Sequence, residues 1–357
     1  MKSTINRTNK SQAAILLALI YLSVHSLKAQ ELSQDKNECW LKALSEASKE
    51  DTAEQIKNRC NDNNAKPSAK LGSDVKQPEA AKSTKKPISR IDQRIKNELE
   101  TIDNPAVITS HKRNYMLPVT YVKEQNSTPF EQVLTNQKLD NAEAKFQLSF
   151  KAPLFSQVFD DQDRLFFGFT LQSYWQLYNS ELSSPFRETN YQPEIFYAIE
   201  NETKIGEWTN KGFMFGVEHQ SNGRTQRFSR SWNRVYANFI FEKDNWVVSF
   251  KPWYRLPEEE KEDPNQAEGD DNPDIEKYMG HFEMSTIYSW EEQNFSLMFR
   301  NNLRSDNKGA LQLDWTFPLG KRFKGHLQYF NGYGESLIDY NHHIERIGFG
   351  VALTDFL

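Results

Sequence analysis

Hydrophobic and polar residues alternate along most of the chain, from about residue 113 to its last residue. In the segment AKFQLSFKAPLF, for example, Phe146, Leu148 and Phe150 share one face, and Gln147 falls between them. A period of two residues is typical of a β-strand with one apolar and one polar face. About twelve such segments are separated by turn residues, which predicts an all-β fold. They lie near residues 113–122, 144–155, 164–177, 192–202, 211–220, 231–243, 245–256, 276–290, 293–304, 309–319, 321–332 and 343–357.

The connections between these segments alternate between short and long. An even number of strands, with short turns at one end and long loops at the other, is the arrangement of an outer-membrane β-barrel. The alternate positions with polar residues, which include Glu200, Arg234 and Arg300, would then face the lumen. A soluble β-sandwich also buries alternate residues, so alternation alone leaves that fold open. The aromatic content of 13% and an N-terminal export signal favour a twelve-stranded antiparallel transmembrane β-barrel with a short N-terminal periplasmic extension.

Residues 1–29 have the layout of a secretory signal peptide. Lys2, Arg7 and Lys10 precede the apolar run AAILLALIYLSV, and small residues follow it. The run is too short for a comfortable membrane-spanning helix, so we predict that the mature chain is exported. After this run the sequence has no stretch of about 18 apolar residues, which excludes transmembrane helices but not a barrel, whose strands are apolar only at every second position.

Two segments are expected between the signal peptide and the barrel. Residues 30–62 hold Cys39 and Cys60 among apolar residues at helical spacing, and the exported compartment is oxidising, so we predict a small disulfide-linked helical segment. Residues 63–104 are mostly poor in large apolar side chains, which predicts a disordered linker and a short amphipathic helix. The barrel domain is predicted to cover residues 105–357.

Charge narrows the choice of partners. The formal net charge is −5, and no long basic tract accompanies it, which argues against nucleic acid as a partner. The acidic stretch EEEKEDPNQAEGDDNPDIE lacks the ordered carboxylate spacing of an EF-hand loop. We therefore expect it to be a solvated extracellular loop.

Three polar residues occur where the alternation predicts lipid-facing positions, in the stretch EHQSNGRTQRFSRSWN. His219 and Ser221 follow Val217 in steps of two, and Asn233 precedes Val235 by two. All three are therefore predicted on the outer surface of the barrel. A short polar loop joins the two strands, so the three residues should also lie close together at the extracellular rim.

This set of residue types points to hydrolysis. A polar group that faces hydrocarbon is costly, which makes a chance placement of three of them unfavourable. A serine nucleophile, a histidine base and an amide that orients the imidazole could cleave an ester, and a hydrolase whose substrate is the lipid should carry them on the outside of the barrel. By itself, however, a His-x-Ser pair arises in many chains, and a histidine at a barrel rim is usually an interfacial polar residue.

Several blocks in order resemble the outer-membrane phospholipase A family from about residue 95 to the end of the chain. They are KFQLSF at 145–150, SSPFRETNY at 183–191, HQSNGR at 219–224, SWNR at 231–234, KPWY at 251–254, DDNPDIEKYMG at 270–280 and GYGESLIDYN at 332–341. The resemblance implies an outer-membrane barrel that hydrolyses acyl esters of phospholipids and lysophospholipids at either glycerol position, as a serine hydrolase of the phospholipase A1/A2 type. It also implies dependence on calcium, activity as a homodimer and an active site near the extracellular leaflet.

Site residues follow from the resemblance position by position. Ser221 corresponds to the nucleophile, His219 to the base and Asn233 to the orienting residue. The calcium ion (Ca2+) of the family would be bound by the backbone carbonyl of Arg224, the hydroxyl of Ser229 and the carbonyl of Ser183 of the partner subunit. Calcium prefers oxygen ligands, including carbonyls, and a cation beside the ester carbonyl can stabilise the developing oxyanion.

The sequence departs from the family at the dimer contact. The family has a glutamine on the lipid side of the third strand, whereas the lipid-side parity here falls on Leu171 and Gln172 should face inward. A shift of the strand by one residue would turn Gln172 outward. The alternative function is a non-catalytic porin or lipid-binding outer-membrane barrel.

Overall fold

A computed structural model describes residues 89–355 of the chain, apart from 103, 105–106, 132–136, 161, 262, 264–265, 267–268 and 321. The predicted signal peptide (1–29), the predicted disulfide-linked segment (30–62) and the linker as far as residue 88 lie outside the described residues. The proposed pairing of Cys39 with Cys60 and the domain boundaries therefore remain predictions.

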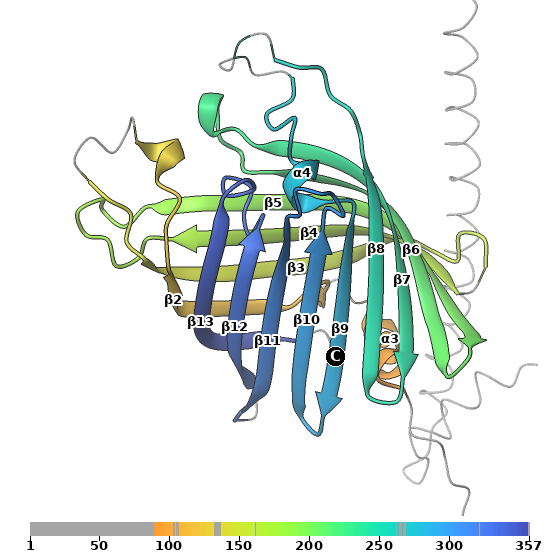
Figure 1. Cartoon of the computed structure of the whole chain (residues 1–357). Coiled ribbons are helices and arrows are strands. Elements are labelled where there is room, and N and C mark those ends of the chain that lie inside the picture. The colour runs from red at the N-terminus through yellow and green to blue at the C-terminus, as the bar shows by residue number, and fades with distance from the viewer. Residues whose placement is uncertain are drawn as a thin grey trace, which may run out of the picture. The chain divides into compact units, whose positions relative to one another are not determined.

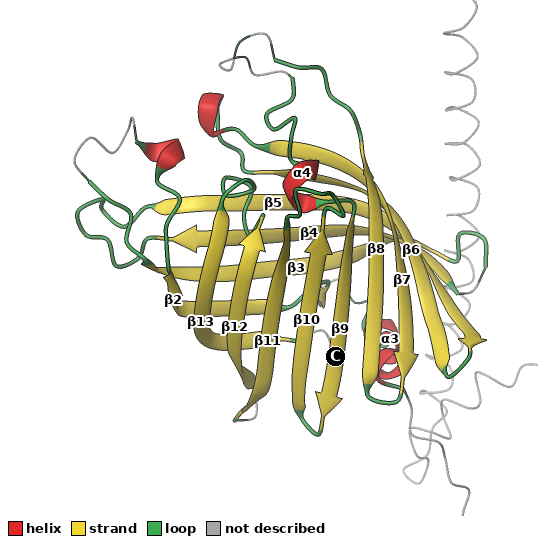
Figure 2. Ribbon diagram, viewed as in Figure 1, coloured by secondary structure: helices red, strands yellow, loops and turns green. Residues whose placement is uncertain are grey.

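Within the described residues, twelve strands, β2 to β13, form a closed antiparallel barrel (Figures 1 and 2). Each strand pairs with its neighbours in the chain, and β13 pairs with β2 to complete the circle. The two-residue strand β1 adds to β3. The strands are β1 (Thr109–Ser110), β2 (Asn114–Val122), β3 (Ala142–Ser156), β4 (Asp163–Trp175), β5 (Phe186–Ile205), β6 (Trp208–Ser221), β7 (Ser231–Lys243), β8 (Trp246–Arg255), β9 (Phe282–Trp290), β10 (Gln293–Asn301), β11 (Gly309–Leu319), β12 (Phe323–Tyr333) and β13 (His343–Thr354). The predicted fold class is confirmed.

The alternation in the sequence becomes an outer apolar face and an inner polar face. In β6, Phe215 and Val217 are 48% and 50% exposed, whereas Glu218, the next residue, points inward and is 3% exposed. Half-exposed apolar side chains recur on the outer face of most strands. Such a band would be unfavourable in water and is the surface that a barrel presents to hydrocarbon.

One predicted strand is shorter than expected. The sequence predicts a strand over 276–290, but β9 begins at Phe282, and residues Glu276–Met279 form the short helix α4. The reason is that Ile275 and Met279, both buried, are four residues apart and so lie on one side of a helical turn. Gly280 has a φ of 68°, and a Cβ atom there would lie 2.3 Å from the carbonyl oxygen of Asn301, so only glycine fits this turn.

A helix lies against the inner wall at the end of the barrel that has the short turns. It is α3 (Arg90–Leu99), in the stretch predicted to be helical, and the hydroxyl of Ser89 accepts from the backbone of Asp92 at its start. Ile91 packs against Val247 and Ile287, and Lys151 pairs with Glu98 at 2.7 Å. Two 3-10 turns, η1 (Thr128–Phe130) and η2 (Gln226–Phe228), lie in the longer loops. No helix in the described ranges is long and apolar enough to cross a bilayer.

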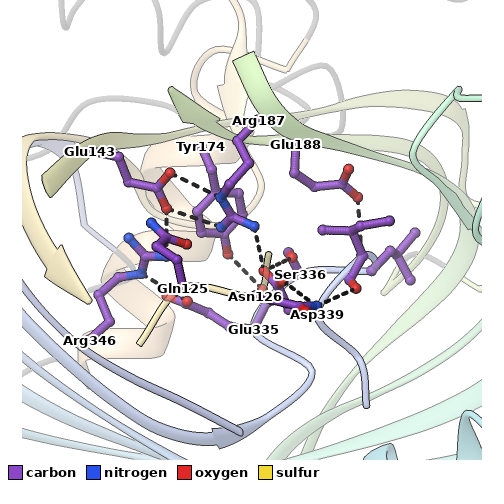
Figure 3. Close-up of polar contacts among 12 residues, drawn as sticks. Gln125, Asn126, Glu143, Tyr174, Arg187, Glu188, Glu335, Ser336, Asp339 and Arg346 are labelled. Atoms are coloured by element: carbon purple, nitrogen blue, oxygen red, sulfur yellow. Dashed lines mark hydrogen bonds and ion pairs between the residues drawn. The ribbon is translucent and has the colours of Figure 1, made fainter. Parts of the chain in front are cut away.

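Buried ion pairs fill the lumen near the long loops (Figure 3). Arg187 donates two hydrogen bonds of 3.0 Å to Glu143 and one of 2.8 Å to Asp339. Arg346 joins the same Glu143, at 2.7 Å, to Glu335, at 2.8 Å. Burial opposes ionisation of Glu335, but Arg346 and Lys145 outweigh it and hold the pKa of that carboxyl below its usual range.

The connection between β12 and β13 contributes to this network from inside the barrel. The long connections were expected to be loops at one end of the barrel, but in this one Leu337, Ile338 and Asp339 are almost completely buried. The hydroxyl of Ser336 donates to Asp339 at 2.6 Å, and the backbone of Ile338 donates to Glu188 at 3.2 Å. Asp339 and the backbone of Ile338 are therefore bonded to Arg187 and Glu188 of β5, and the segment occupies space that an open pore would need.

Candidate active site

The three residues predicted to form the site lie where β6 ends and β7 begins. The two strands pair with His219 opposite Asn233 and Ser221 opposite Ser231. Alternation puts His219 and Ser221 on the side of the exposed Val217, and the side chains of the site are half-buried. Arg234, next to Asn233, is buried on the lumenal side and pairs with Glu218. The expectation that the three polar side chains share the outer face, near one rim, agrees with this register.

His219 and Asn233 are joined by a hydrogen bond of 2.8 Å between Nδ1 and Oδ1. A carboxamide oxygen only accepts, so the imidazole carries its proton on Nδ1. The other ring nitrogen, Nε2, then has a free lone pair and can act as a base. The pair thus has the tautomer that a general base next to a serine requires.

Ser221 stands apart from this pair. Over the described residues, its hydroxyl makes no hydrogen bond, with His219 or with any other group. Residues two apart in a strand have Cα atoms about 7 Å apart on one face, a span that a hydroxyl and an imidazole can close by side-chain rotation. Hydrogen bonds of this kind are often long in the absence of substrate and shorten when it binds.

The residues expected to bind calcium lie in two neighbouring loops. Arg224 and Ser229 belong to the loop between β6 and β7, and the side chain of Asn222 fixes that loop by accepting from the backbones of Arg224, at 3.3 Å, and Arg230, at 3.0 Å. Ser183 belongs to the loop between β4 and β5 and has a φ of 57°. In the described part of the chain it makes no hydrogen bond with Arg224 or Ser229.

The donor chemistry of this loop suits calcium. The hydroxyl of Ser229 lies 2.7 Å from a carboxylate oxygen of Asp271, which belongs to the connection between β8 and α4, so hard oxygen atoms from two segments meet here. Among the described residues, no group of three or more His, Cys, Asp or Glu side chains is placed to hold a metal ion. A site made of backbone carbonyls and hydroxyls does not require such a group, because calcium accepts neutral oxygen ligands.

Gln172 faces the lumen, as the parity predicts. Its amide donates to the hydroxyl of Tyr115 at 3.1 Å and its carbonyl accepts from Tyr174 at 3.1 Å. On the outer face, Leu171 lies between Leu148 of β3 and Tyr191 of β5. The strand shift that would have turned Gln172 outward does not occur, and this part of the lipid-facing surface is apolar.

One residue in contact with the site, Glu258, was not expected from the sequence. The Nδ2 atom of Asn233 donates to a carboxylate oxygen of Glu258 at 3.0 Å, although the acidic loop was expected to be solvated. The backbone of Leu256 also donates to the carbonyl of Asn233 at 2.8 Å. The signal that could have located Glu258 is the register of β7 and β8, which sets Arg234 opposite Arg255 and so brings the following residues beside Asn233.

Comparisons with known proteins agree with this architecture. The family model described as phospholipase A1 matches residues 91–353. The phospholipase A1 of Escherichia coli K12 is 38% identical over 264 residues, covering 73% of this chain and 86% of that protein, and that of Proteus vulgaris is 37% identical over 261 residues, with the same coverage.

Solved structures give the same result. The outer-membrane phospholipase A of Escherichia coli superposes with a TM-score of 0.65 at 35% identity, over 70% of this chain and all of that one. An outer-membrane phospholipase dimer of Salmonella typhi with bound calcium superposes with a TM-score of 0.66 at 35% identity, over 71% of this chain and 94% of that one. With a closed barrel of twelve strands and a family match over most of its length, the chain belongs to the phospholipase A1 family of outer-membrane phospholipases.

Proposed function

We propose that this protein is a calcium-dependent serine hydrolase that cleaves the acyl esters of phospholipids and lysophospholipids, at either glycerol position, in the outer leaflet of the outer membrane. Family membership supports the phospholipase activity. The observation that carries the finer assignment is the hydrogen bond between His219 and Asn233 on the outer face of the barrel, two residues from Ser221. The substrate would approach along the membrane, so no passage through the barrel is needed.

The reaction would use the three side chains in separate roles. His219 Nε2 takes the proton of the Ser221 hydroxyl as Oγ attacks the ester carbonyl, and it returns that proton to the leaving alcohol. Asn233 holds the Nδ1–H in place, which keeps Nε2 directed away from the amide. Water, activated by the same nitrogen, then releases the fatty acid from Ser221. The half-buried position at the rim limits competing water while the acyl chain stays in the lipid.

Calcium would be bound by the carbonyl of Arg224, the hydroxyl of Ser229 and the carbonyl of Ser183 of the partner subunit. When bound, a calcium ion supplies positive charge near the developing oxyanion. The relative from Salmonella typhi is a dimer with bound calcium, and we infer a homodimer for the active form of this chain. The family contact involves the third strand of the barrel, here β4, whose outward Leu171 would add apolar area instead of a polar pair.

The assignment is tested by labelling together with turnover. Purified protein in detergent micelles should release fatty acid from phospholipid when calcium is present. An alkyl sulfonyl fluoride should inactivate it and modify Ser221, as located by mass spectrometry of the digested protein. Ion conductance across planar bilayers without fatty-acid release would instead establish a porin, and retained lipid binding without turnover would establish a lipid-binding barrel.

Chelation of calcium should abolish fatty-acid release, and Ser229→Ala should raise the calcium concentration needed for half-maximal activity by about tenfold or more, since a hydroxyl ligand is lost. Titration of activity with calcium measures this. Thr225→Ala removes an exposed hydroxyl from the same loop and should leave the titration unchanged. Full activity in excess chelator would rule out the proposed calcium site.

A further inference from the structure

The carboxylate of Glu258 is hydrogen-bonded to Asn233 and, over the described residues, to neither His219 nor Ser221. It accepts from Asn233 Nδ2 at 3.0 Å, while Asn233 Oδ1 lies 2.8 Å from His219 Nδ1. Within the described ranges, Glu258 forms no ion pair, and Asn233 is the partner of its side chain. The negative charge of a half-buried carboxylate acts more strongly on neighbouring groups when no cation is paired with it.

The backbone on both sides of Glu258 is held in place. On one side, Leu256 donates to the carbonyl of Asn233 at 2.8 Å, which extends the pairing of β7 with β8 by one residue. On the other side, the carbonyl of Glu259 accepts from the backbone of Asp270 at 2.7 Å. Arg255 then binds both carboxylate oxygens of Asp270 at 2.6 Å. Glu258 therefore sits on a segment fixed at two points, which lowers the entropic cost of holding its carboxylate against Asn233.

This contact does two things that Asn233 cannot do alone. A carboxylate only accepts, so it binds the amide nitrogen and leaves the amide oxygen turned toward His219, which excludes the flipped amide and its incorrect imidazole tautomer. An amide also supplies no charge to an imidazolium. Glu258 places a negative charge two hydrogen bonds away, and hydrogen bonds in a chain polarise one another when little water is present.

We propose that Glu258 is a positioning residue for ester hydrolysis, which acts through Asn233 to fix the His219 tautomer and to stabilise the imidazolium that forms when Ser221 loses its proton. This inference rests on the proposed function and deepens it. The protein would then have a series of four residues, Ser221, His219, Asn233 and Glu258. In a Ser-His-Asp triad the third residue supplies the negative charge, whereas here the fourth residue would supply it.

The first test separates the charge from the contact. Glu258→Gln keeps the size and an acceptor for Asn233 but removes the charge, and it should lower kcat for phospholipid hydrolysis about tenfold with KM unchanged, because the imidazolium exists only after the substrate is bound. Glu258→Ala removes both and should lower kcat further. Glu259→Gln is the matched control, since it removes the same charge from the adjacent exposed residue and should leave kcat and KM as they are.

The second test exchanges the amide of Asn233 and the carboxylate of Glu258. Asn233→Asp alone sets two carboxylates against each other and should be strongly impaired. Adding Glu258→Gln to Asn233→Asp restores a donor and an acceptor in reversed order, with the carboxylate directly on His219, and should raise kcat at least about tenfold above Asn233→Asp alone. A residue that merely shaped the loop would give no such recovery, because its effect would not depend on residue 233.

The outcomes distinguish this inference from the proposed function. All variants are first checked for folding by their migration in SDS without heating. If Ser221→Ala keeps its activity, the proposed function itself fails. If Ser221→Ala is inactive but Glu258→Gln has the kcat of Glu259→Gln, or the exchange variant shows no recovery, the role of Glu258 is overturned and the proposed function stands.

Discussion

Replacing Ser221 with alanine should lower fatty-acid release at saturating calcium by roughly 10^5-fold or more, which is the scale of loss when a hydrolase loses its nucleophile. The reason is that His219 would then have no serine hydroxyl beside it on the outer face from which to take a proton. The barrel should be unaffected, because the Ser221 hydroxyl makes no hydrogen bond among the described residues. Fatty acid released from mixed micelles is the measurement, and heat-dependent migration in SDS reports the fold.

Ser231→Ala is the matched control for this experiment. Ser231 is directly opposite Ser221 on the neighbouring strand, and its hydroxyl lies 3.4 Å from Asp271. It makes no hydrogen bond with His219 over the described part of the chain, so its loss should change the rate by less than about tenfold. Equal losses in the two variants, or a loss only in Ser231→Ala, would show that Ser221 is not the nucleophile.

Replacing Arg187 with methionine should lower the free energy of unfolding by about 3–5 kcal/mol, which is the usual effect of removing one partner from a buried ion pair. Arg187 is buried between Glu143 and Asp339, and each carboxylate would lose its hydrogen bonds to the guanidinium. Arg346 would still neutralise part of the charge on Glu143, but Asp339 would keep only weaker neutral partners. Urea unfolding of the protein in detergent or lipid vesicles, followed by tryptophan fluorescence, measures the change.

The same substitution at an exposed site separates burial from loss of charge. Arg304 and Asp306 are 3.5 Å apart and both are more than half exposed, so Arg304→Met should change the free energy of unfolding by less than about 1 kcal/mol. Similar effects at Arg187 and Arg304 would mean that the lumenal network contributes little to stability. In that case the role of the network would be to fill the lumen and exclude water from it, not to stabilise the fold.

The strands could be predicted from the sequence because each must present apolar side chains to lipid at every second position. Most strand ends agree within a few residues, since turn residues interrupt the alternation. Helix α4 was missed because Ile275 and Met279 are buried by helical spacing inside a stretch that otherwise reads as loop and strand. The burial of residues 334–340 was also missed, since this short mixed segment shows no period that reveals its lumenal partners.

The site was partly predictable because the alternation shows which face of the barrel each side chain occupies. Parity alone places His219 and Ser221 on the outer face, and the pairing of β6 with β7 brings Asn233 beside them. The residue types suggested a nucleophile, a base and an orienting amide, and the family resemblance made the assignment specific, because a His-x-Ser pair alone arises in many chains. Glu258 was not predicted, since it lies in a loop without a period, and only the exact register of β7 with β8 shows that it reaches Asn233.

The pairing of β2 with β13 has a consequence for biogenesis. This seam joins the first and last strands of the barrel sequence, with Thr120 opposite Gly348, so it can form only after the last strand has been synthesised. Helix α3 precedes the first strand of the seam yet lies against the inner wall, where Arg94 donates to the carbonyls of Ser110 and His111. Because α3 is bonded to the inner wall and precedes β2 in the chain, we expect the helix to be enclosed when β13 pairs with β2.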